Sequence, residues 1–270
     1  MKIAVVGHLE WVDFVDVTRV PMAGEIVHGT PVVGVAAGGG AVAAVALARW
    51  GVESLFFTSF GGDDLGTRAR AELEERGVTL HAMTRDIPQR RAVTLVDAQR
   101  ERTIIVIGAR HVAHGADPLP WHELAQCDAV YVTGGDAAAV RAARTARVVV
   151  ATSRVLPLLR ESGIQIDALV GSANDPDERF ADGDLDPSPH LVVRTDGARG
   201  GTYTLAGTTH AYAAVPGVVQ GDTYGAGDTF AAGLTYALGD GRDPAEAISF
   251  ASGRAAEILS ARGPYPSGAR

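Results

Sequence analysis

QGDTYGAGDTFAAGL, Gln220–Leu234, places two aspartates around a Gly-Ala-Gly turn just before an alanine-rich apolar run. The run predicts a helix over Ala226–Leu238, so the glycines fall at its N-terminus. The first amides of a helix have no partner inside the helix, and the helix dipole adds partial positive charge there. Glycines let this backbone approach an anion closely, as in phosphate-binding loops.

Asp228 follows these glycines, inside the first turn of the predicted helix. In its simplest interpretation, an aspartate at this place is the N-cap of the helix. A carboxylate next to a bound phosphate is also what a kinase uses to take the proton of an attacking hydroxyl. Two interpretations therefore stand for this stretch: a capped helix, or an anion-binding turn with a general base beside it.

Strand and helix patterns alternate along most of the chain, which predicts an α/β fold with a mostly parallel sheet covered by helices on both faces. The predicted strands are short β-branched or apolar runs at Ile3–Val6, Leu55–Ser59, Ala129–Thr133, Val148–Ala151, Ala168–Val170 and Leu191–Arg194. The predicted helices are Gly38–Trp50, Leu65–Arg76, Ala137–Arg144, Leu156–Glu161, Pro176–Phe180, Ala226–Leu238 and Pro244–Ser260.

Three segments do not fit this alternation. Residues of about 11–18 and 26–35 have strand character, and 80–107 contains two strand patterns around a polar turn, which predicts a hairpin. We expect these segments to form a small separate β-layer, a candidate lid. Residues 1–270 are then expected to form a single domain that includes this lid.

The composition restricts the function. A formal net charge of −8 argues against nucleic acid or an anionic membrane as a partner. The single cysteine, Cys127, excludes a disulfide and a cysteine-cluster metal site. Only Lys2 is a lysine, so a Walker A loop, a Schiff-base site and a protein-kinase site all lack their lysine. No signal peptide or membrane-spanning run is recognised, and we expect a cytoplasmic protein that acts on a small molecule.

DTYGAGDTF, Asp222–Phe230, resembles the C-terminal signature of the ribokinase-like (PfkB) family of sugar and nucleoside kinases. The resemblance covers nearly the whole chain, because further family motifs resemble other segments in the right order. It implies a ribokinase-like three-layer α/β/α sandwich with a small β-sheet lid, and an ATP-dependent kinase that phosphorylates a hydroxyl of a small carbohydrate or nucleoside-like substrate. The other segments are PMAGEIVHG (21–29), AAGGGAVAAVALARWG (36–51), GGDDLGTRARAELEERGV (61–78), NDPD (174–177), RTDGARGG (194–201) and ARGPYPS (261–267).

The resemblance implies a role for each matching residue. Asp228 is the expected general base, and the amides of Gly225, Ala226 and Gly227 are the expected anion hole for the transferred phosphoryl group. The expected cofactors are ATP, Mg²⁺ and K⁺. Thr195, Gly197 and Gly200 would contact the nucleotide, Asn174 and Asp177 would hold Mg²⁺ through waters, and Asp222, the Tyr224 carbonyl, Gly263 and Ser267 would form a K⁺-type site.

Two of these motifs also have ordinary structural interpretations. Thr195–Gly201 is equally consistent with a hairpin turn. NDPD is consistent with a helix start that has Asn174 as its cap and Pro176 near the first position. In each case both interpretations can hold together.

The substrate end departs from the family pattern. The Gly38–Gly39 loop is present, but Val42 stands where the family has an asparagine that binds substrate hydroxyls, and Val12 stands where it has an aspartate. Glu10 shares the strand parity of Val12, whereas Asp13 could substitute only if a bulge shifted the strand. The substrate candidates are therefore Glu10, Asp13, Gly38, Gly39 and Val42. Arg110 and the pair Arg90–Arg91 are candidates for binding an anionic substrate.

The two valines favour a substrate with an apolar or deoxygenated face, such as a nucleoside or a modified sugar, over ribose or fructose. They also support an alternative, a catalytically weak family member that binds a ligand and acts as a sensor. The lid is in addition a candidate surface for a homodimer.

Overall fold

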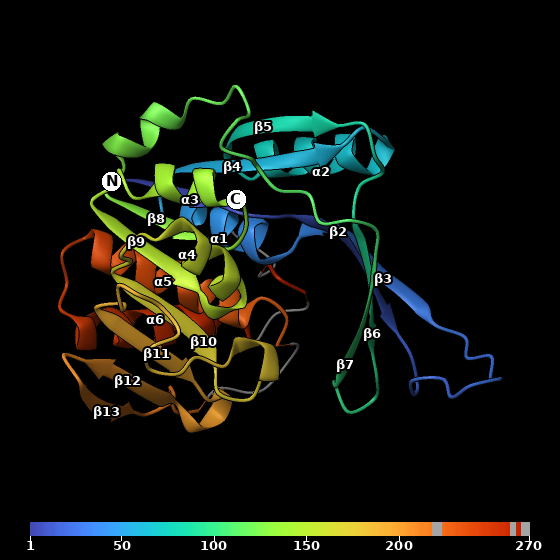
Figure 1. The fold of residues 1–270 in the computed structure, drawn as a ribbon. Coiled ribbons are helices and arrows are strands. Elements are labelled where there is room, and N and C mark those ends of the chain that lie inside the picture. The colour runs from blue at the N-terminus through green and yellow to red at the C-terminus, as the bar shows by residue number, and fades with distance from the viewer. Residues whose placement is uncertain (218–222, 260–262, 266–270) are drawn as a thin grey trace.

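The structure is a computed structural model that describes residues 1–217, 223–259 and 263–265. Its larger sheet has nine strands in the order β13-β12-β11-β10-β9-β8-β1-β4-β5 (Figure 1). From β5 to β11 neighbouring strands are parallel, and β12 and β13 add an antiparallel edge. The strands are β1 (Lys2–Val6), β4 (Glu53–Gly61), β5 (Thr79–Arg85), β8 (Ala129–Val132), β9 (Val148–Thr152), β10 (Ala168–Ser172), β11 (Leu191–Thr195), β12 (Gly201–Leu205) and β13 (Thr208–Tyr212).

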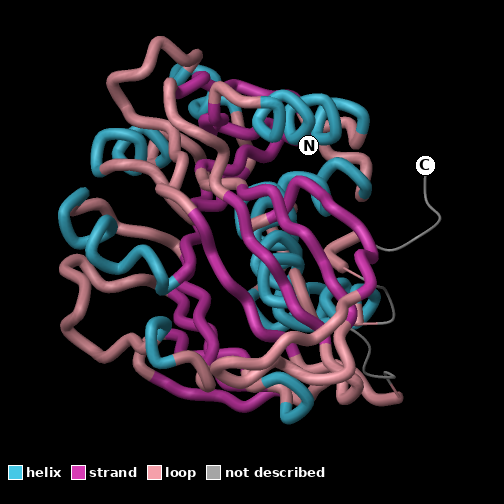
Figure 2. Tube along the Cα trace, turned by 90° about the vertical axis from the view of Figure 1, so that its right-hand side faces the viewer, coloured by secondary structure: helices cyan, strands magenta, loops and turns pink. Residues whose placement is uncertain are grey.

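Helices cover both faces of this sheet, and a separate apolar cluster lies under each layer (Figures 1 and 2). One layer consists of α1 (Gly39–Arg49), α2 (Asp64–Glu75), α5 (Ala226–Gly239) and α6 (Pro244–Ile258). The other contains α3 (Ala137–Ala143) and α4 (Leu156–Ser162). The central strands are buried on both faces, as expected of a parallel sheet between two helical layers. The predicted three-layer α/β/α architecture is confirmed.

A second sheet of four strands, in the order β3-β2-β6-β7, extends away from this body (Figure 1). It is the predicted small β-layer, and we call it the lid. Its strands are β2 (Glu10–Asp16), β3 (Thr30–Ala37), β6 (Arg91–Val96) and β7 (Arg102–Ile107).

The predicted lid segment 80–107 was wrong at its beginning. Residues Thr79–Arg85 form β5, which pairs with β4 in parallel as the edge strand of the large sheet. An edge strand is only partly covered, so its half-buried pattern resembles that of a lid strand. The predicted segment 26–35 also begins too early, because β3 starts at Thr30.

Two other predictions differ from the structure. Pro176–Phe180 is not an α-helix but one 3-10 turn, Pro176–Glu178, because Arg179 already has an extended backbone. The hairpin of β12 and β13 was not predicted, since β12 is half-buried, β13 is largely exposed, and neither strand has a buried apolar run. Among the described residues, no helix is long and apolar enough to cross a membrane.

The parallel strands β1, β8, β9, β10 and β11 are neighbours and end at the same edge of the sheet. In α/β sheets, ligands bind outside the carboxyl ends of such strands. The segments that leave these ends carry polar side chains, and α5 begins with the Gly225–Gly227 turn. The polar residues, one after each strand in chain order, are His8, Thr133, Arg154, Asn174 and Asp196.

Candidate active site

The N-terminus of α5 has the geometry of an anion-binding turn. Its N-cap is Gly225, whose φ of 80° lies in the left-handed region that favours glycine, and no side chain caps the helix. Asp228 is therefore not the N-cap, and the capped-helix interpretation is wrong. The amide of Ala226 donates a long hydrogen bond, of 3.3 Å, to the Thr223 carbonyl oxygen. The amide of Gly227 is bonded to no acceptor in the described part of the chain, so it is available to a ligand.

Asp228 is half-buried against the start of α1. A Cβ atom built on Gly39 would lie 2.8 Å from Oδ1 of Asp228, so glycine at position 39 makes room for this carboxylate. The pKa of Asp228 is raised to about 6, first by burial and then by the negative charge of Glu178, while Arg154 acts in the opposite direction. A carboxylate with this pKa is mostly ionised at neutral pH and is still basic enough to accept a proton in a transition state.

A pocket of about 640 Å³ lies beside this turn and brings together residues that the sequence placed at the nucleotide. Thr195, Gly197 and Gly200 line it from one side, and Ala226 and Gly227 line it from α5. Most of its remaining wall is apolar, as expected of a pocket that binds an aromatic base. That wall includes Tyr212, Ala213, Ala214, Val215, Pro216, Phe230, Ala255, Ala256 and Leu259.

The two interpretations of Thr195–Gly201 hold together. β11 and β12 form an antiparallel hairpin joined by the 3-10 turn Gly197–Arg199, and this turn is also the pocket wall. Gly200 has a φ of 86°, and a Cβ atom there would overlap the Tyr212 carbonyl oxygen. Only glycine fits at this point of the wall.

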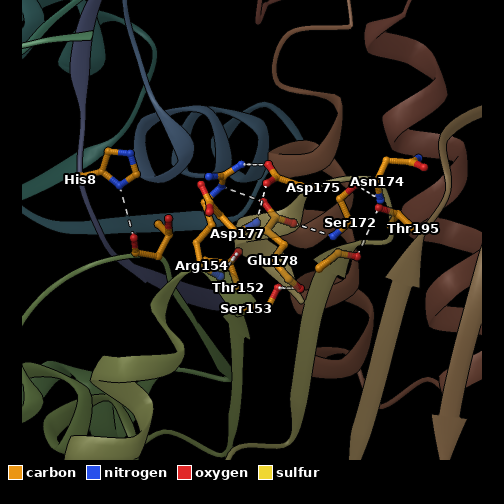
Figure 3. Close-up of polar contacts among 12 residues, drawn as sticks. His8, Thr152, Ser153, Arg154, Ser172, Asn174, Asp175, Asp177, Glu178 and Thr195 are labelled. Atoms are coloured by element: carbon orange, nitrogen blue, oxygen red, sulfur yellow. Dashed lines mark hydrogen bonds and ion pairs between the residues drawn. The ribbon is translucent and has the colours of Figure 1, made fainter. Parts of the chain in front are cut away.

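The NDPD segment lies next to Arg154 (Figure 3). Asn174 donates from Nδ2 to Oδ1 of Asp196 at 2.9 Å and is exposed. The cap of the short turn is Asp175, which accepts the amide of Asp177, so Asn174 is not the cap. Asp177 is exposed, and the site's interior carboxylate comes from the next residue, Glu178.

Sequence reasoning missed Glu178 and Arg154. Glu178 accepts the Ser172 amide at 2.6 Å and pairs with Nε of Arg154 at 2.8 Å, and its charge raises the pKa of Asp228. Arg154 also pairs with Asp175 (Figure 3). The signal for Arg154 was its position just after the predicted strand Val148–Ala151. No sequence signal separated Glu178 from Asp177, because the direction in which each carboxylate points depends on how the 3-10 turn ends.

The predicted cation loop is only partly described. Asp222 and Ser267 lie outside the described residues. Tyr224 and Gly263 are both buried, and the segment after Gly263 packs on the anion-binding turn, since a Cβ atom on Gly225 would lie 3.3 Å from Cβ of Pro264. Within the described ranges no group of three or more His, Cys, Asp or Glu side chains could hold a metal ion. Mg²⁺ in phosphoryl transfer needs fewer protein ligands, because phosphates and waters complete its shell.

The valines of the substrate end are core residues. Val12 and Val42 are 0% and 1% exposed and belong to one apolar cluster with Phe14 and Tyr224, whose rings meet edge to face at 5.0 Å. Gly38, with a φ of 85°, turns the chain into α1 beside Glu10. Both side chains are therefore packed among apolar neighbours, where the resemblance led us to expect polar groups that bind hydroxyls.

Glu10 and Asp13 lie on opposite faces of β2. Asp13 pairs with Arg91 at 2.8 Å and accepts Nε1 of Trp11, and the bulge of β2 comes later, between Phe14 and Val15. The geometry thus does not support Asp13 or Arg91 as substrate ligands. Glu10 is on the site face and pairs with Arg90 at 3.0 Å.

Comparisons with known proteins agree with this fold. Residues 1–162 and 165–269 match the model of the pfkB family of carbohydrate kinases. The ribokinase of Thermotoga maritima is 21% identical with a TM-score of 0.79, covering 98% of this chain and 94% of that one.

Two further solved structures are similar. Arabidopsis thaliana ribokinase, complexed with ribose and ATP, is 20% identical with a TM-score of 0.74, covering 97% of this chain and 93% of that one. The nucleoside kinase of Methanocaldococcus jannaschii is 16% identical with a TM-score of 0.75, covering 98% and 93%. No curated protein sequence matches the chain. At these identities the solved structures establish the fold.

Proposed function

The chain belongs to the pfkB family of carbohydrate kinases, and from this premise we propose that it transfers the γ-phosphoryl group of ATP to a hydroxyl of a small carbohydrate or nucleoside-like acceptor. The observation that carries the proposal is the juxtaposition at the start of α5. A half-buried carboxylate with a raised pKa stands beside an open helix N-terminus, and a nucleotide-sized pocket adjoins that terminus.

In this proposal Asp228 takes the proton from the acceptor hydroxyl as it attacks. The amides of Gly225, Ala226 and Gly227 bind the oxygens of the phosphoryl group, whose charge spreads over them in the transition state. The pocket between Gly197–Gly200 and α6 holds the nucleotide. Support for the last role comes from Gly200, which lines the pocket and lies so close to the chain behind it that a Cβ atom would overlap the Tyr212 carbonyl oxygen.

Mg²⁺, when bound, supplies positive charge to the transferring phosphates. Asn174 and Asp177 are the proposed holders from the sequence, and Glu178 joins them because its negative charge acts on Asp228. Tyr224 and Gly263, with Asp222 and Ser267, are proposed to hold a monovalent cation that orders the anion-binding turn. Both sites remain proposals for this chain.

The acceptor is proposed to differ from ribose. Val12 and Val42 can donate and accept no hydrogen bonds, so sugar hydroxyls entering beside them would lose their partners in water. The absence of hydroxyl-binding groups at these two positions is also the ground for a second candidate function, a ligand-binding sensor of low catalytic activity. Efficient phosphorylation of any acceptor by the wild type would exclude the sensor.

Replacement of the base tests the function. Asp228→Asn keeps the shape of the side chain but cannot accept the proton, so kcat should fall on the order of a hundredfold to ten-thousandfold while ATP affinity changes little. Asp240→Asn, at the other end of α5, is the matched control and should keep full activity. ADP release is measured across sugars, sugar acids, sugar phosphates and nucleosides with ATP and Mg²⁺. A near wild-type rate for Asp228→Asn on any acceptor would refute the assignment.

A further inference from the structure

The lid is tied to the body at one residue of its edge strand β3. This residue, Ala36, is completely buried, although β3 has a neighbouring strand on one side only. Its amide donates to Oε2 of Glu72 on α2 at 2.8 Å, and its carbonyl oxygen accepts the hydroxyl of Tyr265 at 2.6 Å. Two side chains of the body therefore satisfy the backbone groups that a further strand would otherwise bind.

A third side chain, Arg76 at the end of α2, joins these two. It donates to Oε1 of Glu72 from Nη2 at 2.7 Å and from Nε at 3.0 Å. Its guanidinium also lies over the ring of Tyr265, 4.1 Å from the centroid, where a cation is attracted to the aromatic face. The resulting closed set of contacts, which we call the lid clamp, consists of Ala36, Glu72, Arg76 and Tyr265.

The residue before Tyr265 packs against the anion-binding turn. A Cβ atom built on Gly225, the N-cap of α5, would lie 3.3 Å from Cβ of Pro264 and 3.1 Å from Cγ1 of Val42 on α1. The turn is thus held between α1 and the segment that carries Tyr265. Because Pro264 and Tyr265 are adjacent, a displacement of Tyr265 also displaces the side chain that supports Gly225.

The lid strand β2 contacts the same region through an apolar side chain. A Cβ atom on Gly263 would lie 3.7 Å from Cε2 of Phe14, and the Phe14 ring meets that of Tyr224. These contacts do not involve the Tyr265 hydroxyl. Removal of that hydroxyl should therefore loosen the connection between the lid and the turn without separating them.

Building on the proposed function, we infer that Tyr265 is a positioning residue for phosphoryl transfer, because its hydroxyl fixes the base of the lid relative to the anion-binding turn. Ala36 is three residues before Gly39, which begins α1 and lies against Asp228. The lid clamp thus joins the strand that leads to the proposed base with the segment that supports the proposed anion hole. Donors stabilise a transition state only when they are held in place relative to the reacting groups, and this joint holds them.

The alternative is a structural role, in which the Tyr265 hydroxyl only anchors the segment after α6. A bond to any part of the body would serve that purpose. The observed bond instead goes to the lid strand that runs into α1 beside Asp228, and the adjacent Pro264 supports the turn. The two roles differ in their kinetics, because an anchor affects stability alone, whereas a positioning residue affects kcat in a fully folded enzyme.

The kinetic experiment compares Tyr265→Phe with Ser54→Ala. Phenylalanine keeps the ring beneath Arg76 and removes only the hydroxyl. Ser54→Ala is the matched control, since it removes a buried bond of 2.8 Å from a hydroxyl to the Ala44 carbonyl oxygen, between β4 and α1. With any acceptor that the wild type phosphorylates, Tyr265→Phe should lower kcat by on the order of threefold to tenfold and leave KM for ATP unchanged. Ser54→Ala should lower Tm but keep kcat.

Hydrogen exchange of the protein without ligands tests the connection independently of activity. Tyr265→Phe should speed exchange in residues 33–38 by on the order of threefold to tenfold, and in residues 224–231 by a smaller factor. Ser54→Ala should leave the exchange rates of both segments at their wild-type values. Faster exchange in 224–231 is the decisive result, because the Tyr265 hydroxyl is bonded to Ala36 and not to the turn.

Two results would assign Tyr265 a structural role and overturn the inference: a lower Tm with unchanged kcat, or faster exchange confined to residues 33–38. A rise in KM for ATP without a change in kcat would overturn it as well, since the effect would then lie in nucleotide binding. If the wild type phosphorylates no acceptor, the proposed function fails, and exchange alone decides whether the lid clamp fixes the turn. Faster exchange in both segments would support this connection, and unchanged exchange in 224–231 would refute it.

Discussion

The pKa of Asp228 provides a sharp test of how the site tunes its base. Glu178→Gln removes a negative charge that raises this pKa, and it also leaves Arg154 with one anionic partner fewer. Both changes favour the ionised form of Asp228. The glutamine can still accept the Ser172 amide, so the local backbone contact is kept. The pKa of Asp228 should therefore fall in this variant.

The direction of the shift follows from its causes. The pKa of Asp228 is raised from 3.8 to about 6, and Glu178 is the second cause after burial. We take a fall on the order of one unit as the working size of the effect of removing Glu178. A fall of one unit would raise the ionised fraction at pH 5 from about a tenth to about a half. Relative to its own maximum, activity at pH 5 should then increase roughly fivefold.

The assay is the pH dependence of kcat/KM, whose acid limb reports the ionisation of the base in the free enzyme. Because the limb is compared within each variant, a lower maximal rate in Glu178→Gln does not affect the result. Asp177→Asn is the matched comparison, since its carboxylate is exposed and is not among the causes of the Asp228 shift. An acid limb that stays in place or moves upward in Glu178→Gln, or moves equally in Asp177→Asn, would refute the reasoning.

Four further predictions concern stability, the nucleotide, the cation and assembly. The folded state binds the Asp228 proton more tightly than the unfolded chain, so the stability of the wild type should fall as pH rises from about 4 to about 6. Asp228→Asn should therefore be more stable than the wild type at pH 7 by on the order of 1–2 kcal/mol, whereas the two proteins should have equal Tm values near pH 4. Gly200→Ala should weaken ATP binding, measured by calorimetry, more than acceptor binding, because the new Cβ would overlap the Tyr212 carbonyl oxygen. An unchanged affinity for ATP would argue against this pocket as the nucleotide site. If a monovalent cation orders Gly225–Gly227, the rate should rise when K⁺ replaces Na⁺ at constant ionic strength, and a flat response would remove the cation role. If the lid is the surface of a homodimer, Ile105→Lys on β7 should convert the dimer into a monomer in sedimentation, because this apolar side chain is 52% exposed. A monomeric wild type would exclude the lid as a dimer surface.

The sequence predicted the parts of the fold that repeat a strong local pattern. Ile3–Val6 and Val148–Ala151 are buried on both sides, so continuous apolar runs identified them as central strands. Thr79–Arg85 was assigned to the wrong sheet, because an edge strand and a lid strand are both half-covered and only pairing distinguishes them. Pairing partners far apart in sequence leave no local pattern.

The candidate site also has parts that a local sequence pattern reveals and parts that depend on distant contacts. Gly225 and Gly200 are required by backbone geometry, and such glycines are visible in a sequence. Glu178 and Arg154 act on Asp228 through their charges, and this effect depends on contacts with residues tens of positions away. The one-residue difference between Asp177 and Glu178 is decided by a single 3-10 turn, which residue spacing cannot resolve.

Under the proposed function, the two ends of the site are built from different stretches of the chain. Residues 195–259 line the proposed nucleotide pocket, whereas Glu10 and its partner Arg90 lie at the lid junction. If the lid junction binds the acceptor, mutations there would change acceptor preference and leave the residues proposed for phosphoryl transfer intact. Segment exchange with relatives should exploit this independence: a chimaera that receives residues 86–112 from another family member would be a direct route to a new acceptor, and recombination would be expected to tolerate crossovers on either side of that segment.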